Sequence, residues 1–241
     1  MVFSSSIFLY AFLPAFLLLY FLTPRFLRSL ALAACSFVFY GWWKPEFVLL
    51  LLFSSVTDYW IGARIARCRE QHRTRAARRW LTLSIVTNLG LLGYFKYANF
   101  GVASFKMLLQ SLGFAGDFEW VEVVLPVGIS FYTFQTMSYT VDLYRGEVQP
   151  SHNIVDFLCY VSMFPQLVAG PIVRYSVIEG ELKSRQETWS KFYQGVLFFQ
   201  CGLAKKVLLA DAVAIIPDTI YGIPNATGLS CFDAWLGCVG Y

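Results

Sequence analysis

Charged residues are scarce in this 241-residue sequence, and their scarcity limits the class of protein it can encode. Asp, Glu, Lys and Arg make up 14 % of the chain, whereas a soluble domain carries about a quarter. Apolar residues make up 57 %, and the mean hydropathy is +0.56. A water-soluble globule of this size lacks the interior to hide so much apolar surface. We therefore expect an integral membrane protein, with the lipid bilayer as its main partner.

Histidine and paired cysteines are also scarce. The chain has two His, His72 and His152, and six Cys, none of which forms a C-x-x-C pair. No metal site and no disulfide framework are therefore expected. The net charge of +4 is modest and the basic residues gather in one segment, so we expect no nucleic-acid partner. The G-x-S-x-G, H-E-x-x-H, P-loop and Rossmann patterns are missing as well.

The N-terminal end of the sequence lacks the features of a cleaved signal peptide, and the last apolar run lacks the length of a membrane-spanning helix. No Lys or Arg precedes Ile7, and Tyr20 and Phe21 stand where a signal peptide needs small residues. We expect the first apolar run to be a retained membrane helix. The apolar run that starts at Ala234 is too short to cross about 30 Å of hydrocarbon. We thus expect residues 1–241 to be one membrane-embedded domain, the N-terminal portion of a longer chain.

Apolar runs of about the length of membrane helices follow one another along the chain. They lie roughly at 7–23, 28–43, 46–63, 80–98, 123–143, 154–173 and 193–216. A spanning helix needs about 20 apolar residues, and four of these runs fit directly. We expect an all-α fold, a polytopic transmembrane helical bundle with at least one broken or re-entrant helix. The segment 99–122 contains Gly101, Gly113 and Gly116 and is expected to be a loop or an amphipathic piece.

One strongly basic segment predicts how the chain is oriented in the membrane. Seven arginines lie between the third and fourth runs against a lone acid, Glu70; they are Arg64, Arg67, Arg69, Arg73, Arg75, Arg78 and Arg79. The positive-inside rule places this segment in the cytoplasm. Arg25 and Arg28 then fall on the same side, and Lys44 and the N-terminus fall on the opposite side. We therefore expect a multi-pass protein with a periplasmic N-terminus.

A polar stripe interrupts the fifth run. Tyr132, Gln135, Tyr139 and Asp142 are spaced by three, four and three residues, which places them on one face of a helix. In lipid, such groups turn toward the bundle interior or a water-filled cavity. The stripe predicts either a tunnel lining or a set of hydrogen bonds that hold helices together, and the sequence leaves both open.

The sixth run contains residues that oppose a straight helix, namely Pro165, Gly170 and Pro171. Irregular backbone at membrane depth is tolerated only where protein or a water-filled cavity covers it. A broken or re-entrant segment that shapes a substrate path fits this pattern, and so does a plain structural kink.

Charged residues within other apolar runs are further candidates. Lys205 and Lys206 interrupt the last run, which we expect to be two shorter segments that meet at an interface. The pair either attracts the phosphates of a nucleotide-bearing donor or extends to lipid headgroups. Asp58 is either a pairing or pathway acid or a plain interfacial residue. His72 and His152 are expected to be solvated, His152 as part of a helix cap if not free.

Six short motifs occur in an order that resembles the membrane-bound O-acyltransferase family, in the branch typified by the alginate O-acetylation protein. They are Met-Val-Phe-Ser-Ser at the start, Phe-Tyr-Gly-Trp-Trp at 39–43, Tyr-Trp-Ile-Gly at 59–62, Gly-Tyr-Phe-Lys-Tyr-Ala-Asn-Phe at 93–100, Leu-Pro-Val-Gly-Ile-Ser-Phe-Tyr-Thr-Phe-Gln at 125–135 and Ala-Gly-Pro at 169–171. The resemblance runs along the whole chain, and the ordered set is more specific than any one motif.

The resemblance implies a helical funnel in the bacterial inner membrane. It implies an enzyme that takes acetyl from acetyl-CoA at the cytoplasmic side, binds no other cofactor, and passes the acetyl group to a periplasmic acetyltransferase partner. That partner would esterify an exopolysaccharide such as alginate, and the acceptor would be set by the partner. Under this interpretation Tyr132, Gln135 and Tyr139, with Pro165, Gly170 and Pro171, line or shape the path.

The chain departs from the family pattern in one respect. The family's catalytic His lies in a membrane helix downstream of Tyr241, and neither His72 nor His152 is in such a helix, so the role is carried onto neither. Acyl transfer to a hydroxyl needs a general base near neutral pKa, and the chain alone is expected to be incomplete for catalysis. The alternatives are a polytopic transporter or flippase component, and acyl transfer to another acceptor, such as teichoic acid, peptidoglycan or cellulose.

Overall fold

The computed structural model describes residues 3–42, 44–114, 118–167, 170–223 and 229–240. Every regular element among these residues is a helix, which confirms the all-α class. The chain groups into two compact units. The first comprises Tyr10–Arg185, and the second comprises Gln186–Tyr241 with a short N-terminal stretch.

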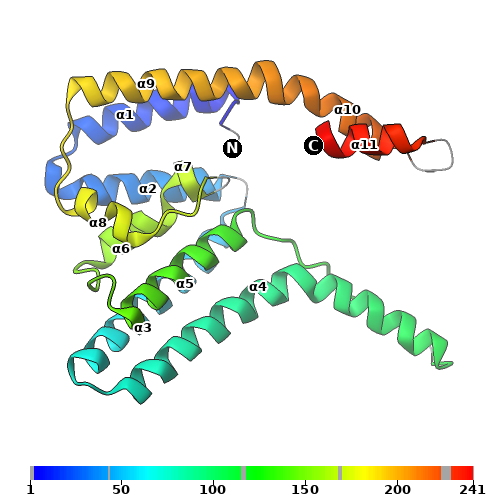
Figure 1. Ribbon diagram of the computed structural model, residues 1–241, viewed down its shortest axis with the longest axis horizontal. Coiled ribbons are helices and arrows are strands. Elements are labelled where there is room, and N and C mark those ends of the chain that lie inside the picture. The colour runs from blue at the N-terminus through cyan, green and yellow to red at the C-terminus, as the bar shows by residue number, and fades with distance from the viewer. Residues whose placement is uncertain (1–2, 43, 115–117, 168–169, 224–228, 241) are drawn as a thin grey trace. The chain divides into compact units, whose positions relative to one another are not determined.

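The helices of the first unit overlap the predicted apolar runs (Figure 1), but the fifth run is helical only from Ile129 and the helix Tyr175–Lys183 lies outside every run. A π-helical stretch, Phe8–Phe12, leads into α1, and a short 3-10 helix, Arg25–Leu27, precedes α2. The α-helices are α1 (Leu13–Leu22), α2 (Arg28–Gly41), α3 (Glu46–Glu70), α4 (Thr74–Ser111), α5 (Ile129–Arg145), α6 (Ile154–Ser162), α7 (Phe164–Leu167) and α8 (Tyr175–Lys183).

Helix α3 is the element of the described residues that is long and apolar enough, by length and composition, to cross a membrane. It extends past the predicted run to Glu70, and α4 begins at Thr74, so most of the predicted basic loop is helical. The turn between them contains His72 in the left-handed region at φ 54°. A bundle with several spans stays a prediction at this point.

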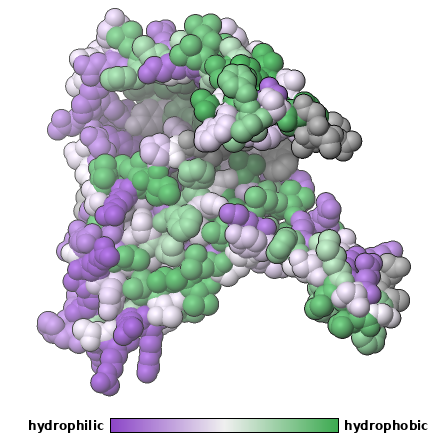
Figure 2. Space-filling view, turned by 45° about the vertical axis from the view of Figure 1, so that its right-hand side comes forward, coloured by the Kyte–Doolittle hydropathy of each residue, from purple (hydrophilic) through white to green (hydrophobic). Residues whose placement is uncertain are grey.

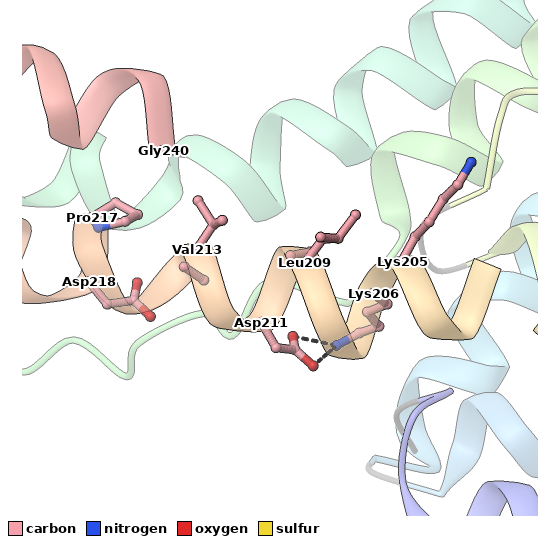
Figure 3. Close-up of a pocket in the computed structure, with 10 residues that line it drawn as sticks. Lys205, Lys206, Leu209, Asp211, Val213, Pro217, Asp218 and Gly240 are labelled. Atoms are coloured by element: carbon pink, nitrogen blue, oxygen red, sulfur yellow. Dashed lines mark hydrogen bonds and ion pairs between the residues drawn. The ribbon is translucent and has the colours of Figure 1, made fainter. Parts of the chain in front are cut away.

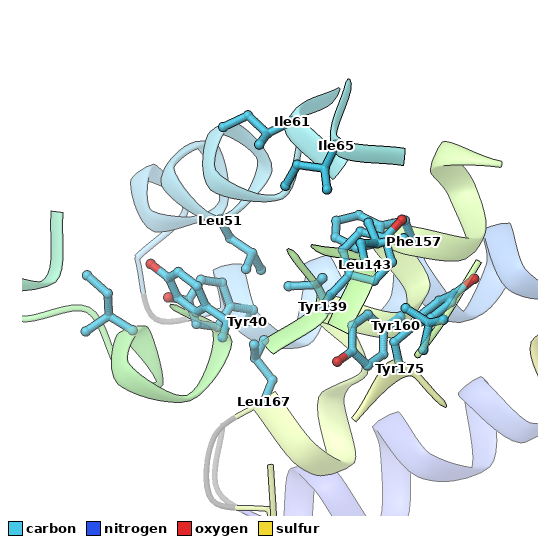
Figure 4. Close-up of a cluster of buried hydrophobic side chains, with 14 residues drawn as sticks. Tyr40, Leu51, Ile61, Ile65, Tyr139, Leu143, Phe157, Tyr160, Leu167 and Tyr175 are labelled. Carbon is cyan, nitrogen blue, oxygen red and sulfur yellow. The ribbon is translucent and has the colours of Figure 1, made fainter. Parts of the chain in front are cut away.

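The core of the first unit forms where α3 packs against α4 and α5, and where α2 and α6 meet. Aromatic rings fill its centre (Figure 4). The ring of Tyr139 lies 4.7 Å from that of Phe157 and 5.0 Å from that of Tyr175, centroid to centroid. Tyr160 lies 5.3 Å from Tyr175. Edge-on and tilted contacts of this kind add to the energy of burial, and they join α5, α6 and α8.

Gly62 allows α3 and α5 to approach closely. A Cβ at this position would lie 2.8 Å from Cδ1 of Leu143 and 2.8 Å from Cε1 of Tyr139. Small residues at such crossings let helix backbones come together in membrane proteins. The close approach brings the polar stripe of α5 against α3.

Glycines in the left-handed conformation stand at both ends of α5. Gly128 precedes the helix at φ 78° and Gly146 follows it at φ 82°. The amides of Gly146 and Glu147 both donate to the carbonyl of Asp142, which ends the helix as a Schellman motif. The guanidinium of Arg69 also donates to the carbonyl of Leu143 at 3.0 Å. One arginine of the basic segment therefore caps a neighbouring helix.

Of the two predictions for 99–122, the loop was wrong for the first half, because α4 continues to Ser111 through Gly101. Gly116 lies outside the described residues. The segment that contains Trp120 and Val123 lies beside α4, where the side chain of Asn99 forms hydrogen bonds with it. Nδ2 of Asn99 donates to the backbone carbonyl of Val123. Oδ1 of Asn99 accepts from the indole N–H of Trp120 and from the backbone N–H of Val123.

The second unit contains α9 (Trp189–Ala204), a π-helical stretch Lys205–Ala210, α10 (Asp211–Tyr221) and α11 (Cys231–Gly240). The first three are continuous, so the expected division of 193–216 into two segments was wrong. The two lysines begin the π-helical stretch, and Lys206 Nζ forms an ion pair with Asp211 Oδ1 at 2.9 Å. Helix α11 packs back on α10.

Candidate functional site at the broken helix

The polar stripe of α5 is buried as predicted. Tyr132, Gln135, Tyr139 and Asp142 are each at most 3 % exposed. Tyr139 Oη accepts a hydrogen bond from the amide of Ser151 at 2.9 Å, which ties α5 to the segment before α6. The stripe thus faces the interior of the first unit.

The sixth run is broken, as its prolines and glycine predicted. Helix α6 ends at Ser162, Met163 leaves the helical conformation, and the single turn α7 follows. The last carbonyls of an α-helix have no partner within the helix. The carbonyl of Tyr160 is one of these, and it accepts from Nε2 of Gln135 at 2.9 Å and from Nε2 of Gln166 at 2.7 Å. Two buried amide side chains therefore satisfy the acceptor that the break releases.

Other polar groups at the break are also paired with side chains. The amide of Phe164 donates to Oγ of Ser36 on α2 at 3.2 Å. The hydroxyl of Tyr160 donates to the carbonyl of Val173 at 3.0 Å. The ring of Phe164 packs among the rings of Phe12, Phe16 and Phe39. Protein groups thus pair with these polar atoms of the break, as irregular backbone at membrane depth requires.

The structure brings only some of the predicted site residues together. Pro165 lies in α7 and Pro171 in the non-helical stretch after it, and both are exposed. Gly170 lies against the backbone of Gln166, where a Cβ would not fit, and its amide donates to the carbonyl of Gln166. Gln135 meets the break directly, whereas Pro165 and Pro171 shape it from the exposed side. Val168 and Ala169 lie outside the described residues.

A set of buried polar atoms beside the stripe has no hydrogen bond of normal geometry within the described part of the chain. They are the hydroxyls of Tyr40, Tyr132 and Ser162, and Oδ2 of Asp142. The hydroxyls of Tyr40 and Tyr132 interact with each other electrostatically. Buried polar atoms nearly always have a partner, so these four atoms are exceptions within the core of the first unit.

A second polar cluster links α3, α4 and α5, and the sequence showed only its acid. Asp58 is 1 % exposed, which favours its role as a pairing acid. Its Oδ1 accepts from Ser84 Oγ at 2.7 Å and its Oδ2 from Asn88 Nδ2 at 2.7 Å. Ser84 Oγ also lies 3.1 Å from Thr140 Oγ1. Among the described residues, no cationic side chain forms an ion pair with Asp58.

Comparison with known proteins decides the family. A model of the membrane-bound O-acyltransferase family matches residues 41–227, most of the chain. The chain belongs to this family. Over all of its 241 residues it is 45 % identical to a Pseudomonas aeruginosa protein named probable alginate O-acetylase AlgI, and 44 % identical to the Azotobacter vinelandii protein of the same name. It is 31 % identical to a Helicobacter pylori protein named peptidoglycan O-acetyltransferase.

This O-acyltransferase-family chain spans about half the length of the curated relatives it matches, namely 45 %, 47 % and 50 % of the three named. The resemblance seen in its motifs is thereby confirmed at the level of the family. No solved structure matches the chain.

Neither histidine of this family member lies in a buried position. His72 is in the exposed turn between α3 and α4, and His152 is exposed before α6. Asn153, not His152, caps α6, because its side chain accepts from the amide of Val155. The described residues contain no group of three or more His, Cys, Asp or Glu arranged for a metal ion.

The lysine pair borders a cavity of about 580 Å³ within the second unit (Figure 3). The side chains of Lys205 and Lys206 point in different directions, and Lys206 meets Asp211 through two contacts of 2.9 and 3.2 Å. Asp218 lines the same cavity. The Asp211 carboxylate offsets the charge of Lys206, which weakens the case for a phosphate site here.

Proposed function

We propose that a protein containing this chain is a polytopic O-acetyltransferase of the bacterial inner membrane, which moves acetyl groups toward an exopolysaccharide such as alginate. The observation that carries the proposal is the 45 % identity to a probable alginate O-acetylase over the whole chain. Family membership favours acyl transfer over a transporter or flippase role. The relative named peptidoglycan O-acetyltransferase supports peptidoglycan as a second candidate acceptor.

The distribution of charge in the first unit supports a cytoplasmic side for its basic end. Helix α2 begins at Arg28, α3 ends after Arg67 and Arg69, and α4 begins after Arg73, so consecutive antiparallel helices place these residues at one end (Figure 1). Hydrophilic side chains gather at the end that holds the α3–α4 turn, and apolar ones lie above it (Figure 2). The positive-inside rule then puts this end in the cytoplasm and the start of the chain in the periplasm.

The donor and the partners in this proposal follow from the resemblance to the family. Acetyl-CoA, held at the cytoplasmic side, supplies the acyl group, and no other cofactor is needed. A periplasmic acetyltransferase partner receives the acetyl group and esterifies the polysaccharide. Residues of this chain shape the passage, since Gln135 and the atoms near Tyr132 are the buried polar groups next to the broken helix. The base for acyl transfer comes from outside the described residues.

The test uses the complete reading frame in a host whose own alginate O-acetylase gene is deleted. We expect restored acetyl esters on secreted alginate, measured by NMR of the purified polymer. A matched strain with an empty vector sets the baseline. Restored peptidoglycan esters without alginate esters would move the acceptor to peptidoglycan, and no acetylation of either polymer would contradict the proposal.

A further inference from the structure

A groove in the first unit lies apart from the polar stripe and has the shape of a site for an amphiphile. Its volume is about 280 Å³. Apolar side chains from α1, α2 and α8 form the walls, among them Phe16, Leu32 and Leu182, and Met163 of the break closes one side. Arg185 and Glu181 are the charged residues on its lining.

The guanidinium of Arg185 is held in place at the polar end of this groove. It donates to Oγ of Ser29 at 2.9 Å and to the hydroxyl of Tyr20 at 3.4 Å, and it lies 5.9 Å from the centre of the Tyr20 ring. Arg28 lies over the same ring at 5.3 Å. Two guanidinium groups therefore meet at one tyrosine. Arginine has five N–H donors in a planar fork that suits phosphate, and among the described residues Arg185 has no carboxylate partner.

The groove lies at the basic end of the unit, where α2 begins with Arg28. Several large apolar residues of α1 are exposed, including Leu18, Leu19 and Leu22, as expected of a helix that faces lipid. A guanidinium group at the end of an apolar groove, at the proposed cytoplasmic interface, suits a phospholipid that places its phosphate on the arginine and one acyl chain in the groove.

We propose that this groove binds one anionic phospholipid, with its phosphate on Arg185 and one acyl chain against Phe16, Leu32 and Leu182. The site is separate from the acyl path and does not depend on the proposed enzymatic function. Its occupant is a lipid of the inner leaflet, which would fasten α1 and α8 to the broken segment at Met163.

The experiment titrates the complete purified protein with phosphatidylglycerol or phosphatidylcholine and counts bound lipids by native mass spectrometry. We expect tighter binding of phosphatidylglycerol, and we expect Arg185→Gln to weaken that binding by about tenfold, the loss of a charge-assisted hydrogen bond. Arg79→Gln is the matched control, because Arg79 is exposed in the basic segment and does not line the groove.

A second variant tests the apolar slot and keeps the test valid if Arg185→Gln fails to fold. Leu182→Trp fills the groove and should abolish the tight site, whereas Leu83→Trp, at an exposed position on α4, should retain it. Equal affinity for the two lipids, or equal loss in both arginine variants, would overturn the proposal. Displacement of the lipid by inorganic phosphate would show an ion site, and displacement by lower concentrations of acetyl-CoA would show a donor site; both would overturn it.

Discussion

At the scale of single residues, the buried groups that lie in apolar surroundings are fixed by specific partners. Asp58 has two donors on α4, and the carbonyl of Tyr160 has two amide donors from α5 and α7. An unpaired buried polar group costs about 1–3 kcal/mol. Each of these side chains therefore contributes mainly by preventing another group from being left without a partner.

Replacing Asp58 by Leu should lower the free energy of unfolding by about 2–4 kcal/mol, because Ser84 and Asn88 each lose a buried acceptor. Asp58→Asn keeps one carbonyl oxygen and should cost less. Thermal unfolding in detergent measures both, with Glu119→Leu, an exposed position, as the control. If Asp58→Leu is no more destabilising than Glu119→Leu, the cluster does not hold α3 to α4.

Gln135 and Gln166 offer a matched pair, because both donate to the carbonyl of Tyr160. Replacing either by Leu should lower stability by about 1 kcal/mol, since the other amide still satisfies the carbonyl. If Gln135 also lines the acetyl path, Gln135→Leu alone should reduce polymer acetylation, by about tenfold or more. Acetyl esters are measured at equal protein levels. Equal acetylation in both variants would leave Gln135 with a structural role only.

At the scale of helices, close packing and helix ends decide how the elements meet. Gly62 sets the distance between α3 and α5, and Gly146 with Arg69 closes the end of α5. The break between α6 and α7 turns a helix end inward and brings its free carbonyl to the polar stripe. These elements are therefore linked by a few tight contacts and not only by their apolar faces.

Gly62→Ala should destabilise the protein by about 1–3 kcal/mol, because the added methyl forces Tyr139 and Leu143 away from α3. Gly93→Ala is the control, since a Cβ there meets nothing within 4 Å. That change should be neutral or stabilising by up to about 1 kcal/mol through helix propensity. The difference between the two shifts in melting temperature measures the cost of the added contact between α3 and α5. Equal shifts would mean that α5 moves away without cost.

At the scale of the whole molecule, the distribution of arginine gives the first unit a basic end. This end determines the membrane orientation that we propose. The same end holds the α3–α4 turn and the start of α2. An orientation with this end in the periplasm would oppose the positive-inside rule. Topology is thus a property of the assembled helices and not of any one of them.

Single cysteines at Arg75 and at Lys44 should report opposite sides of the membrane. In intact cells, treated to open the outer membrane, a membrane-impermeant maleimide should label Lys44→Cys and leave Arg75→Cys unlabelled. Lysed cells should label both, which controls for accessibility. The background lacks the native cysteines. Labelling of Arg75→Cys in intact cells would contradict the proposed orientation.

The sequence alone predicted the features that depend on local composition and spacing. Scarce charge and long apolar runs indicated a helical membrane protein, the three-four-three spacing placed Tyr132, Gln135 and Tyr139 on one buried face, and Pro165, Gly170 and Pro171 predicted the break. The ordered motifs indicated the family. Each of these follows from local composition and spacing, or from the order of motifs along the chain, so no knowledge of long-range contacts was needed.

Only the tertiary structure decided which distant groups meet. It paired Asp58 with Ser84 and Asn88, and it brought Gln135 and Gln166 to one carbonyl. It also showed that the chain around Lys205 and Lys206 stays helical, with Lys206 paired to Asp211. Such outcomes depend on how helices pack across many residues, and that packing is set by the sum of many weak contacts that no local pattern records.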